Sequence, residues 1–270
     1  KERWLYEPWV EYGGPTILFG DGGGGKSTIA LIIAASIAGG FPILGDGLHA
    51  EPIPVLYLDW ETSADIHAER LEAICRGFDV DLPPIYYQRM TTSLEDAAPI
   101  VRRRIAELGI GFVVVDSLGM AKGNGEGAEG PTIRLFNAAR TFGAPWLGID
   151  HVSKVAGASS TRPYGSTYTH NAARRTWSAE KIGDETGDGL TILFTNHKSN
   201  NGRLSRRRAF ALAFMEDALG NPVSIEVKPQ DMHVQLSPDF MLALMNVGEE
   251  RVSRMIAPLM KEMRLGMQTI

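Results

Sequence analysis

The hydrophobic positions of the first 150 residues fall into short apolar runs that alternate with longer amphipathic stretches. The short runs predict strands at 16–19, 55–58, 85–88, 112–115 and 146–149. The longer stretches have helical spacing and predict helices over 26–38, 64–76, 94–108 and 133–142. Strands that alternate with helices of about ten to fifteen residues are typical of βαβ units. The pattern therefore predicts an α/β fold with a mostly parallel sheet flanked by helices.

The pattern changes after residue 150, where apolar runs follow one another without long helices between them. These runs are 176–182, 190–196, 209–214 and 223–227, joined by turns rich in glycine, aspartate and asparagine. They predict an antiparallel strand extension of the parallel core. Residues 249–265 have helical spacing. We therefore expect a core over 1–245, followed in 246–270 by a C-terminal helix that begins a further module.

Composition excludes several classes of protein. Hydrophobic residues make up 44% of the 270 residues and charged residues 22%, which is typical of a globular protein. The longest apolar run, 29–38, is shorter than the roughly 18 residues that span a bilayer, so we expect no membrane association. Cys75 is the only cysteine, which excludes an internal disulfide and a cysteine metal cluster. A cytoplasmic location is the corresponding expectation.

The net charge of −5 argues against a generally basic nucleic-acid-coating protein. It leaves open a ring whose basic residues are concentrated in a central channel. Arginines are clustered at 102–104, at 174–175 and at 203 with 206–208. Each cluster is either a solvated face or a binding surface, and composition does not separate the two.

The strongest motif follows the first predicted strand of the core. Residues 20–27, GDGGGGKS, fit the phosphate-binding pattern G-x-x-x-x-G-K-[ST] between a strand and a helix. The glycines that let the backbone turn around phosphates are Gly20, Gly22, Gly23, Gly24 and Gly25. Lys26 is placed to reach the β- and γ-phosphates of ATP, and the Ser27 hydroxyl to bind Mg²⁺, with Thr28 supporting the site.

A second acid is expected on the metal side of this site. Residues 112–117, FVVVDS, form a buried strand that ends in Asp116, the Walker B pattern. Asp116 would hold Mg²⁺ through water or through Ser27.

Hydrolysis also needs a group that orients or deprotonates water. Some P-loop enzymes carry a glutamate directly after the Walker B aspartate, but here that residue is Ser117. The strand at 55–58 ends in Asp59 and Glu61, and as a neighbouring strand it would bring Glu61 beside the γ-phosphate. We favour Glu61 as the base over Asp59. The alternative is that Glu61 is only an acid near a helix N-terminus, since Thr62, Ser63 and Asp65 also resemble caps.

Together these features resemble the RecA-like class of P-loop ATPases, and within it the RepA-type hexameric helicases of plasmids and phages. The resemblance covers about residues 10–215. It includes the phosphate loop, VLYLDWE, FVVVDS, a strand that ends in His151, Gly165-Ser166 followed by Arg174, and KSNNG at 198–202, which is similar to a Lys-x-Asn-x-Gly segment.

The resemblance implies a homo-oligomer, a hexameric ring with ATP between subunits, that moves on single-stranded DNA as a replicative helicase and meets replication proteins. It implies that His151 senses the γ-phosphate and that Arg174 is an arginine finger for the neighbouring site. Arg175 is the close alternative, because one residue decides which face of a strand is used. Both arginines can equally be a solvated surface pair.

Further roles remain open in this resemblance. Lys198 is a second trans-acting candidate, although the arginine that relatives carry two residues later is Asn200 here, and Arg203 is placed to compensate. The loops after Asp116 and His151 would face a central pore. Their candidate DNA contacts are Lys122, Lys154, Arg162, Tyr164 and Tyr168.

Two other functions fit the same core. A recombinase or recombination mediator would form open filaments on DNA instead of closed rings. A regulatory ATPase would remodel a protein partner without touching DNA, which suits the acidic composition.

Overall fold

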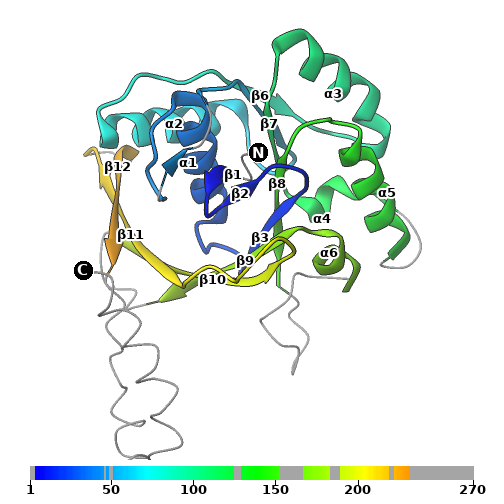
Figure 1. The fold of residues 1–270 in the computed structure, drawn as a ribbon. Coiled ribbons are helices and arrows are strands. Elements are labelled where there is room, and N and C mark those ends of the chain that lie inside the picture. The colour runs from blue at the N-terminus through cyan, green and yellow to red at the C-terminus, as the bar shows by residue number, and fades with distance from the viewer. Residues whose placement is uncertain are drawn as a thin grey trace, which may run out of the picture. The chain divides into compact units, whose positions relative to one another are not determined.

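A nine-stranded sheet forms the centre of the fold in a computed structural model that describes residues 4–45, 47–48, 51–124, 129–152, 167–182, 189–218 and 222–230 (Figure 1). Across the sheet the order is β12 (Pro222–Gln230), β11 (Arg208–Glu216), β10 (Gly189–Ser199), β9 (Arg175–Ile182), β3 (Thr16–Gly20), β8 (Trp146–His151), β7 (Phe112–Asp116), β5 (Val55–Asp59) and β6 (Ile85–Arg89). The strands from β9 to β6 are parallel, and β10, β11 and β12 continue the sheet in antiparallel fashion. The predicted fold class is confirmed.

One strand differs in its pairing from the prediction. The run at 176–182 was expected to open the antiparallel extension, but β9 pairs in parallel with β3 and in antiparallel fashion with β10. A long connection that includes α6 (Thr167–Ala172) leads from β8 to β9. Such a crossover returns the chain in the same direction as β3, which a short turn cannot do.

Helices cover both faces of the parallel strands, and two hydrophobic clusters result. On one face α1 (Lys26–Gly39) and α2 (Ala64–Phe78) contribute to the first cluster. On the other face α3 (Leu94–Leu108), α4 (Leu118–Ala121) and α5 (Glu129–Arg140) contribute to the second. Successive residues of β7 divide between the clusters, as expected for a strand buried on both sides: Val114 is in the first, and Val113 and Val115 are in the second.

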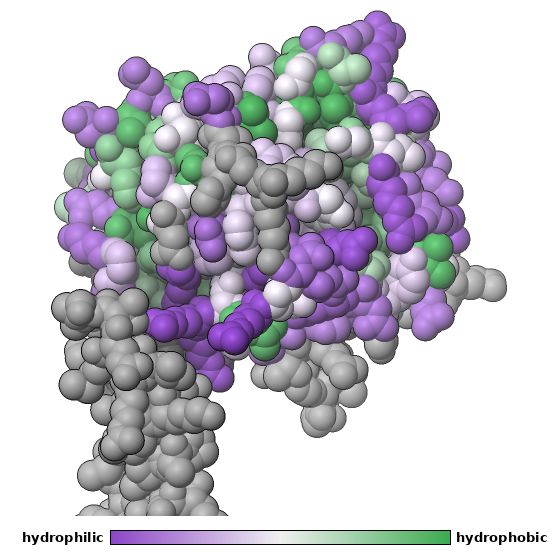
Figure 2. Space-filling view, in the orientation of Figure 1, coloured by the Kyte–Doolittle hydropathy of each residue, from purple (hydrophilic) through white to green (hydrophobic). Residues whose placement is uncertain are grey.

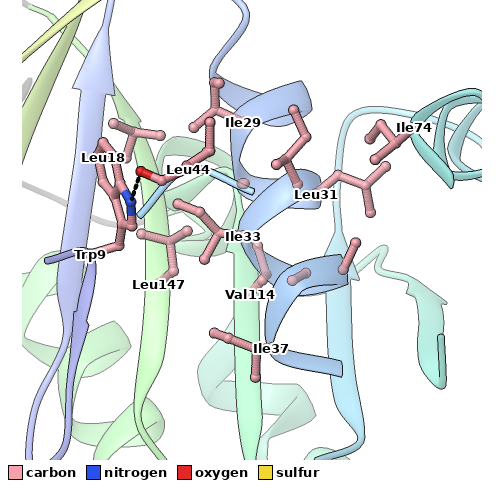
Figure 3. Packing of buried hydrophobic residues seen from close by; sticks show 14 of the residues in the cluster. Trp9, Leu18, Ile29, Leu31, Ile33, Ile37, Leu44, Ile74, Val114 and Leu147 are labelled. Carbon is pink, nitrogen blue, oxygen red and sulfur yellow. Dashed lines mark hydrogen bonds between the residues drawn. The ribbon is translucent and has the colours of Figure 1, made fainter. Parts of the chain in front are cut away.

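Nearly every residue of α1 is buried, because the helix packs between the sheet and its neighbouring elements. Ile29 and Ile33 pack in the same cluster as Leu147 and Val114 of the strands beneath (Figure 3). Gly40 ends the helix in a left-handed conformation that favours glycine. The phosphate loop is thus followed by a rigid, buried element that fixes its direction.

The sequence prediction missed a small sheet at the N-terminus. Its order is β2 (Val10–Glu11), β1 (Trp4–Glu7) and β4 (Gly47–Leu48), and these strands are too short to show a period of two. Trp9 follows β1 and donates from Nε1 to the Leu44 carbonyl at 3.0 Å (Figure 3). Its ring also packs against Trp177, with ring centroids 4.8 Å apart. These contacts join the N-terminal segment to the core of the large sheet.

The antiparallel end of the sheet packs on α2. A Cβ at Gly77 of α2 would lie 2.1 Å from the Ile225 carbonyl oxygen of β12, so the two backbones are in close contact. The Arg76 side chain donates a hydrogen bond to the Val223 carbonyl of the same strand. The last strand of the sheet, β12, is thus held against α2.

Several predictions lie outside the described residues: the helix at 249–265, the segment 246–270, Lys154, Arg162 and Tyr164. Of the predicted helices, 133–142 is observed as α5, which begins four residues earlier. On the face drawn in Figure 2, hydrophobic residues are interspersed with hydrophilic ones. Within the described segments, no helix is both long and apolar enough to cross a membrane.

Candidate functional site

Strand register brings the predicted site residues to one edge of the sheet. Asp59 at the end of β5 pairs with Asp116 at the end of β7. His151 at the end of β8 pairs with Gly20, where the phosphate loop begins. The carboxyl ends of parallel strands are the usual place for a ligand in such folds.

The phosphate loop has the backbone that its glycines permit. Gly23 and Gly25 have φ angles of 73° and 74°, in the left-handed region that favours glycine. Lys26 is buried, and its Nζ donates to the Asp21 carbonyl at 2.6 Å. Burial lowers the pKa of Lys26, and the nearby carboxylates, Asp116 first among them, partly oppose this shift. The ammonium group is therefore positioned at the loop by both a hydrogen bond and negative charge.

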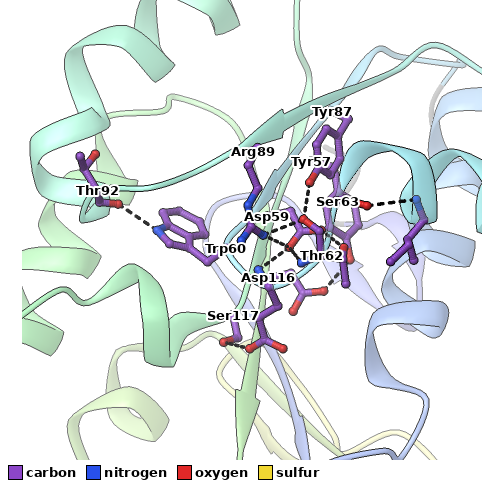
Figure 4. A network of polar contacts seen from close by, with 12 residues as sticks. Tyr57, Asp59, Trp60, Thr62, Ser63, Tyr87, Arg89, Thr92, Asp116 and Ser117 are labelled. Carbon is purple, nitrogen blue, oxygen red and sulfur yellow. Dashed lines mark hydrogen bonds and ion pairs between the residues drawn. The ribbon is translucent and has the colours of Figure 1, made fainter.

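Asp116 has the features of a metal-side acid. Tyr57 donates its hydroxyl to Oδ2 at 2.8 Å (Figure 4), while Oδ1 is buried without a hydrogen-bond partner among the described residues. Burial raises the pKa of Asp116 to about 6, although the Ser27 hydroxyl, which interacts with the same carboxylate, opposes the shift. A buried carboxylate oxygen beside a hydroxyl is the donor set that Mg²⁺ prefers. The residues present therefore fit this ion.

Glu61 points into the pocket, and Asp59 does not. Asp59 accepts hydrogen bonds from the backbone N–H groups of Glu61 and Thr62 at 2.7 and 2.9 Å, and from the Thr62 hydroxyl, so it caps the turn that follows β5 (Figure 4). Glu61 Oε1 instead accepts a hydrogen bond from the Ser117 hydroxyl and lies 3.7 Å from His151 Nε2. Ser63 is the N-cap of α2, so Glu61 precedes the helix rather than belonging to its first turn.

The route by which Glu61 reaches the site differs from the expectation of a neighbouring strand. β8 and β7 lie between β3 and β5. Glu61 arrives because the chain continues past the end of β5, where the Trp60 N–H donates to the Asp116 carbonyl at 2.8 Å. This bond ties the segment to β7, and so to the Walker B position.

His151 and Asp150 face opposite sides of the sheet edge, as successive strand residues do. His151 faces Glu61. Asp150 is buried, accepts the His151 backbone N–H through Oδ1 at 3.0 Å, and has Oδ2 4.0 Å from Lys122 Nζ at the end of α4. Burial raises the pKa of Asp150 to about 6. Lys122, a predicted DNA contact, thus lies beside a buried carboxylate.

The pocket above the phosphate loop has a volume of about 960 Å³. Its lining includes Lys26, Glu61, Asp116 and His151. Arg70 lines it too, although the sequence pattern placed this residue only within the predicted helix at 64–76. Arg70 lies nine residues after Glu61, on a helix that starts at the pocket. Its position in the helical pattern does not show which neighbour it faces, and only the packing of α2 decides this.

The trans-acting candidates lie at the other edge of the sheet. Arg175 pairs with Thr16, the first residue of β3, whereas the phosphate loop follows the last. Arg174 is exposed and lies over Gly14, where a Cβ would be 2.1 Å from Arg174 Cγ. Arg203 is exposed in the turn after β10. Exposed cations at this edge are remote from the pocket of the same chain.

Arg175 is a structural residue, unlike its neighbour. Its buried guanidinium lies 2.6 Å from Glu11 Oε1 and also donates to Asn196, Ser199 and Ser205. These contacts occupy the guanidinium within its own chain, so Arg175 does not fit the role of an arginine finger.

Two further predicted residues have internal contacts. Lys198 donates to the carbonyls of His170 and Asn171 at 2.8 and 2.7 Å, at the end of α6. Tyr168, expected in a pore loop, lies in α6, where its ring packs edge-on against Phe136 at 6.0 Å. It packs there because α6 lies against α5 and the second cluster.

Comparison with known proteins agrees with this geometry. A family model described as an AAA domain matches residues 1–157. Among solved structures, a KaiC-like protein from the hyperthermophilic archaeon Pyrococcus horikoshii OT3 is similar, with a TM-score of 0.56, 14% identity, and coverage of 83% of this chain and 94% of that chain. At this identity the likeness concerns the fold. No curated protein matches the sequence.

Proposed function

Because the chain belongs to the AAA domain family and is a P-loop ATPase of the RecA-like type, we propose that it hydrolyses Mg·ATP and uses the reaction to move on single-stranded DNA. The proposed assembly is a ring, a hexameric replicative helicase with ATP between subunits. The observation that carries the proposal is the position of Glu61, with its Oε1 held by Ser117 and facing the pocket that Lys26 enters.

Each group has a defined part in this chemistry. Glu61 orients the attacking water and accepts its proton. Lys26 neutralises phosphate charge, and Ser27 and Asp116 would hold Mg²⁺, which supplies further charge neutralisation when bound. Arg70 adds a second cation on the α2 side of the same pocket. The Ser117 hydroxyl fixes one carboxylate oxygen of Glu61, which leaves the other for water.

Arg174 and the phosphate loop lie at opposite edges of the sheet, and this separation supports assembly into a ring. Arg174 is exposed at the edge opposite the phosphate loop, so its guanidinium can complete only the pocket of another subunit. His151 contacts Glu61 and is followed in sequence by Lys154 and Arg162. A change at the γ-phosphate would be passed through His151 to these DNA-contacting cations.

Steady-state ATP hydrolysis with and without single-stranded DNA tests the proposal, with Lys26→Ala as the blank. We expect turnover that depends on Lys26 and rises several-fold with DNA. Turnover that depends on Lys26 but ignores DNA would rule out the helicase. A monomeric mass at micromolar protein with bound nucleotide would rule out the ring.

One observation favours a second candidate, a regulatory ATPase that acts on a protein partner. The chain is acidic overall. Lys122 is the one cation of the proposed DNA-contacting loops that lies within the described residues, and its charge is next to the buried carboxylate of Asp150. Lys26-dependent turnover that a protein partner stimulates and DNA does not would identify this function.

A further inference from the structure

The pocket is lined from both sides of β3, and the two sides supply different groups. Glu61, Asp116 and His151 come from the ends of β5, β7 and β8, and they supply charge and hydrogen-bonding groups. Leu190 and Phe214 line the pocket from β10 and β11, which lie across β3 from those strands (Figure 1). The charged side chains of Lys181 and Glu216 also line the pocket on this side, so Leu190 and Phe214 form an apolar patch within it.

The apolar patch begins at the phosphate loop itself. A Cβ at Gly25 would lie 2.7 Å from Leu190 Cδ2 and 2.8 Å from Ile192 Cδ1. Ile192 is fully buried, whereas Leu190 is only partly buried and lines the pocket. Apolar surface therefore continues outward from the loop along β10.

Phe214 extends this surface. Leu190 pairs with Leu212 of β11, and Phe214 lies two residues further along β11 on the same face. Phe214 packs on the first hydrophobic cluster but remains partly exposed, and it lines the pocket. A partly exposed aromatic ring beside a phosphate-binding loop is suited to cover a flat apolar group.

We propose that Leu190 and Phe214 form the seat of the nucleobase, with Phe214 stacking on the base. This proposal rests on the proposed function, in which the γ-phosphate lies toward Glu61. A triphosphate bound with that polarity must extend away from β7, toward β10 and β11. Because strands lie about 4.8 Å apart, β10 is about 10 Å from β3, within reach of the base of a nucleotide held at the loop. Stacking favours a purine, whose flat face is larger than that of a pyrimidine.

Equilibrium binding to the full chain tests this seat, with ATP, CTP and inorganic tripolyphosphate as probes in the presence of Mg²⁺. We expect ATP to bind more tightly than either of the other two. Phe214→Ala should weaken ATP binding by about tenfold, since the stacking of a base on an aromatic residue contributes about that much to affinity. The affinity for tripolyphosphate should be unchanged. Phe214→Leu, which keeps apolar packing, should fall between. Tyr86→Ala, which removes an exposed aromatic residue of β6, is the matched control.

Tripolyphosphate binding also reports whether each variant keeps a folded phosphate loop. If Phe214→Ala lost affinity for ATP and for tripolyphosphate equally, the proposed base-binding site would be wrong, because Phe214 would then have only a structural role. Unchanged ATP binding in that variant would overturn it as well. If the proposed function itself were wrong and the phosphates did not bind at Lys26, the result would differ: Lys26→Ala would then change the affinity for neither ATP nor tripolyphosphate.

Discussion

The Ser117 hydroxyl donates a hydrogen bond to Glu61 Oε1 across two neighbouring strands. The contact is possible because Asp59 pairs with Asp116, so the residues that follow β5 and β7 emerge together. In some P-loop enzymes the position of Ser117 is itself a glutamate. Here a serine in that position holds a glutamate that arrives from the adjacent strand.

Replacing Glu61 should separate binding from chemistry. Loss of a general base lowers turnover by about 10²- to 10⁴-fold, so we expect Glu61→Gln to fall by at least 10²-fold while ATP affinity stays nearly constant. Single-turnover hydrolysis and equilibrium nucleotide binding measure the two effects. Glu69→Gln, an exposed acid on α2, is the control and should retain full turnover. Normal hydrolysis by Glu61→Gln would mean that another group activates water.

Replacing Arg175 should lower stability, whereas replacing the adjacent Arg174 should lower turnover. Arg175→Met removes the positive charge that neutralises the buried Glu11 carboxylate, which costs about 3–5 kcal/mol of stability. Arg174→Ala should leave stability nearly unchanged and slow turnover of the assembled protein. Chemical denaturation and ATP hydrolysis measure the two properties. Mixing Arg174→Ala with Lys26→Ala should restore some activity if the arginine acts on a neighbouring subunit, and no restoration would argue for a role within one subunit.

Two glycines of the phosphate loop offer a matched comparison. Gly25 has a left-handed φ of 74°, and a Cβ there would contact Leu190 and Ile192 below 3 Å. The left-handed conformation alone costs about 1–2 kcal/mol for other residues, so Gly25→Ala should destabilise the protein by at least that much. A Cβ at Gly22 has nothing within 4 Å, and Gly22→Ala should be close to neutral for stability. Thermal unfolding of both variants checks the difference, and equal melting temperatures would contradict it.

The Asp150 carboxyl should make stability fall as pH rises from about 4 to 6. Burial raises its pKa from an ordinary 3.8 to about 6, with Lys122, His151 and Lys26 opposing the shift. Over this range the folded state binds the proton that the unfolded state has lost, so ionisation costs folding free energy. Asp150→Asn should therefore gain up to about 3 kcal/mol over wild type at pH 8.

At pH 4 this gain should largely vanish, because the carboxyl is mostly protonated in the folded state. Urea unfolding at both pH values measures the effect. A gain of equal size at both would show that ionisation of Asp150 is not its cause.

The sequence by itself determined the local elements and the phosphate-binding chemistry of this protein. Continuous apolar runs such as 112–115 and helical spacing over 94–108 depend on neighbours in sequence, and both appear in the structure with nearly the predicted bounds. Lys26, Ser27 and the loop glycines belong to one continuous motif, so their meeting required no knowledge of the fold.

Tertiary structure decided everything that depends on which segments become neighbours. Strand order placed β7 and β8 between β3 and β5, and a hydrogen bond after β5 then brought Glu61 to the pocket. Burial made Arg175 an ion-pair partner of Glu11, 164 residues away in sequence, while Arg174 stayed exposed. The packing of α2 turned Arg70 to the site. Such contacts join residues far apart in the chain, and no local period or spacing encodes them.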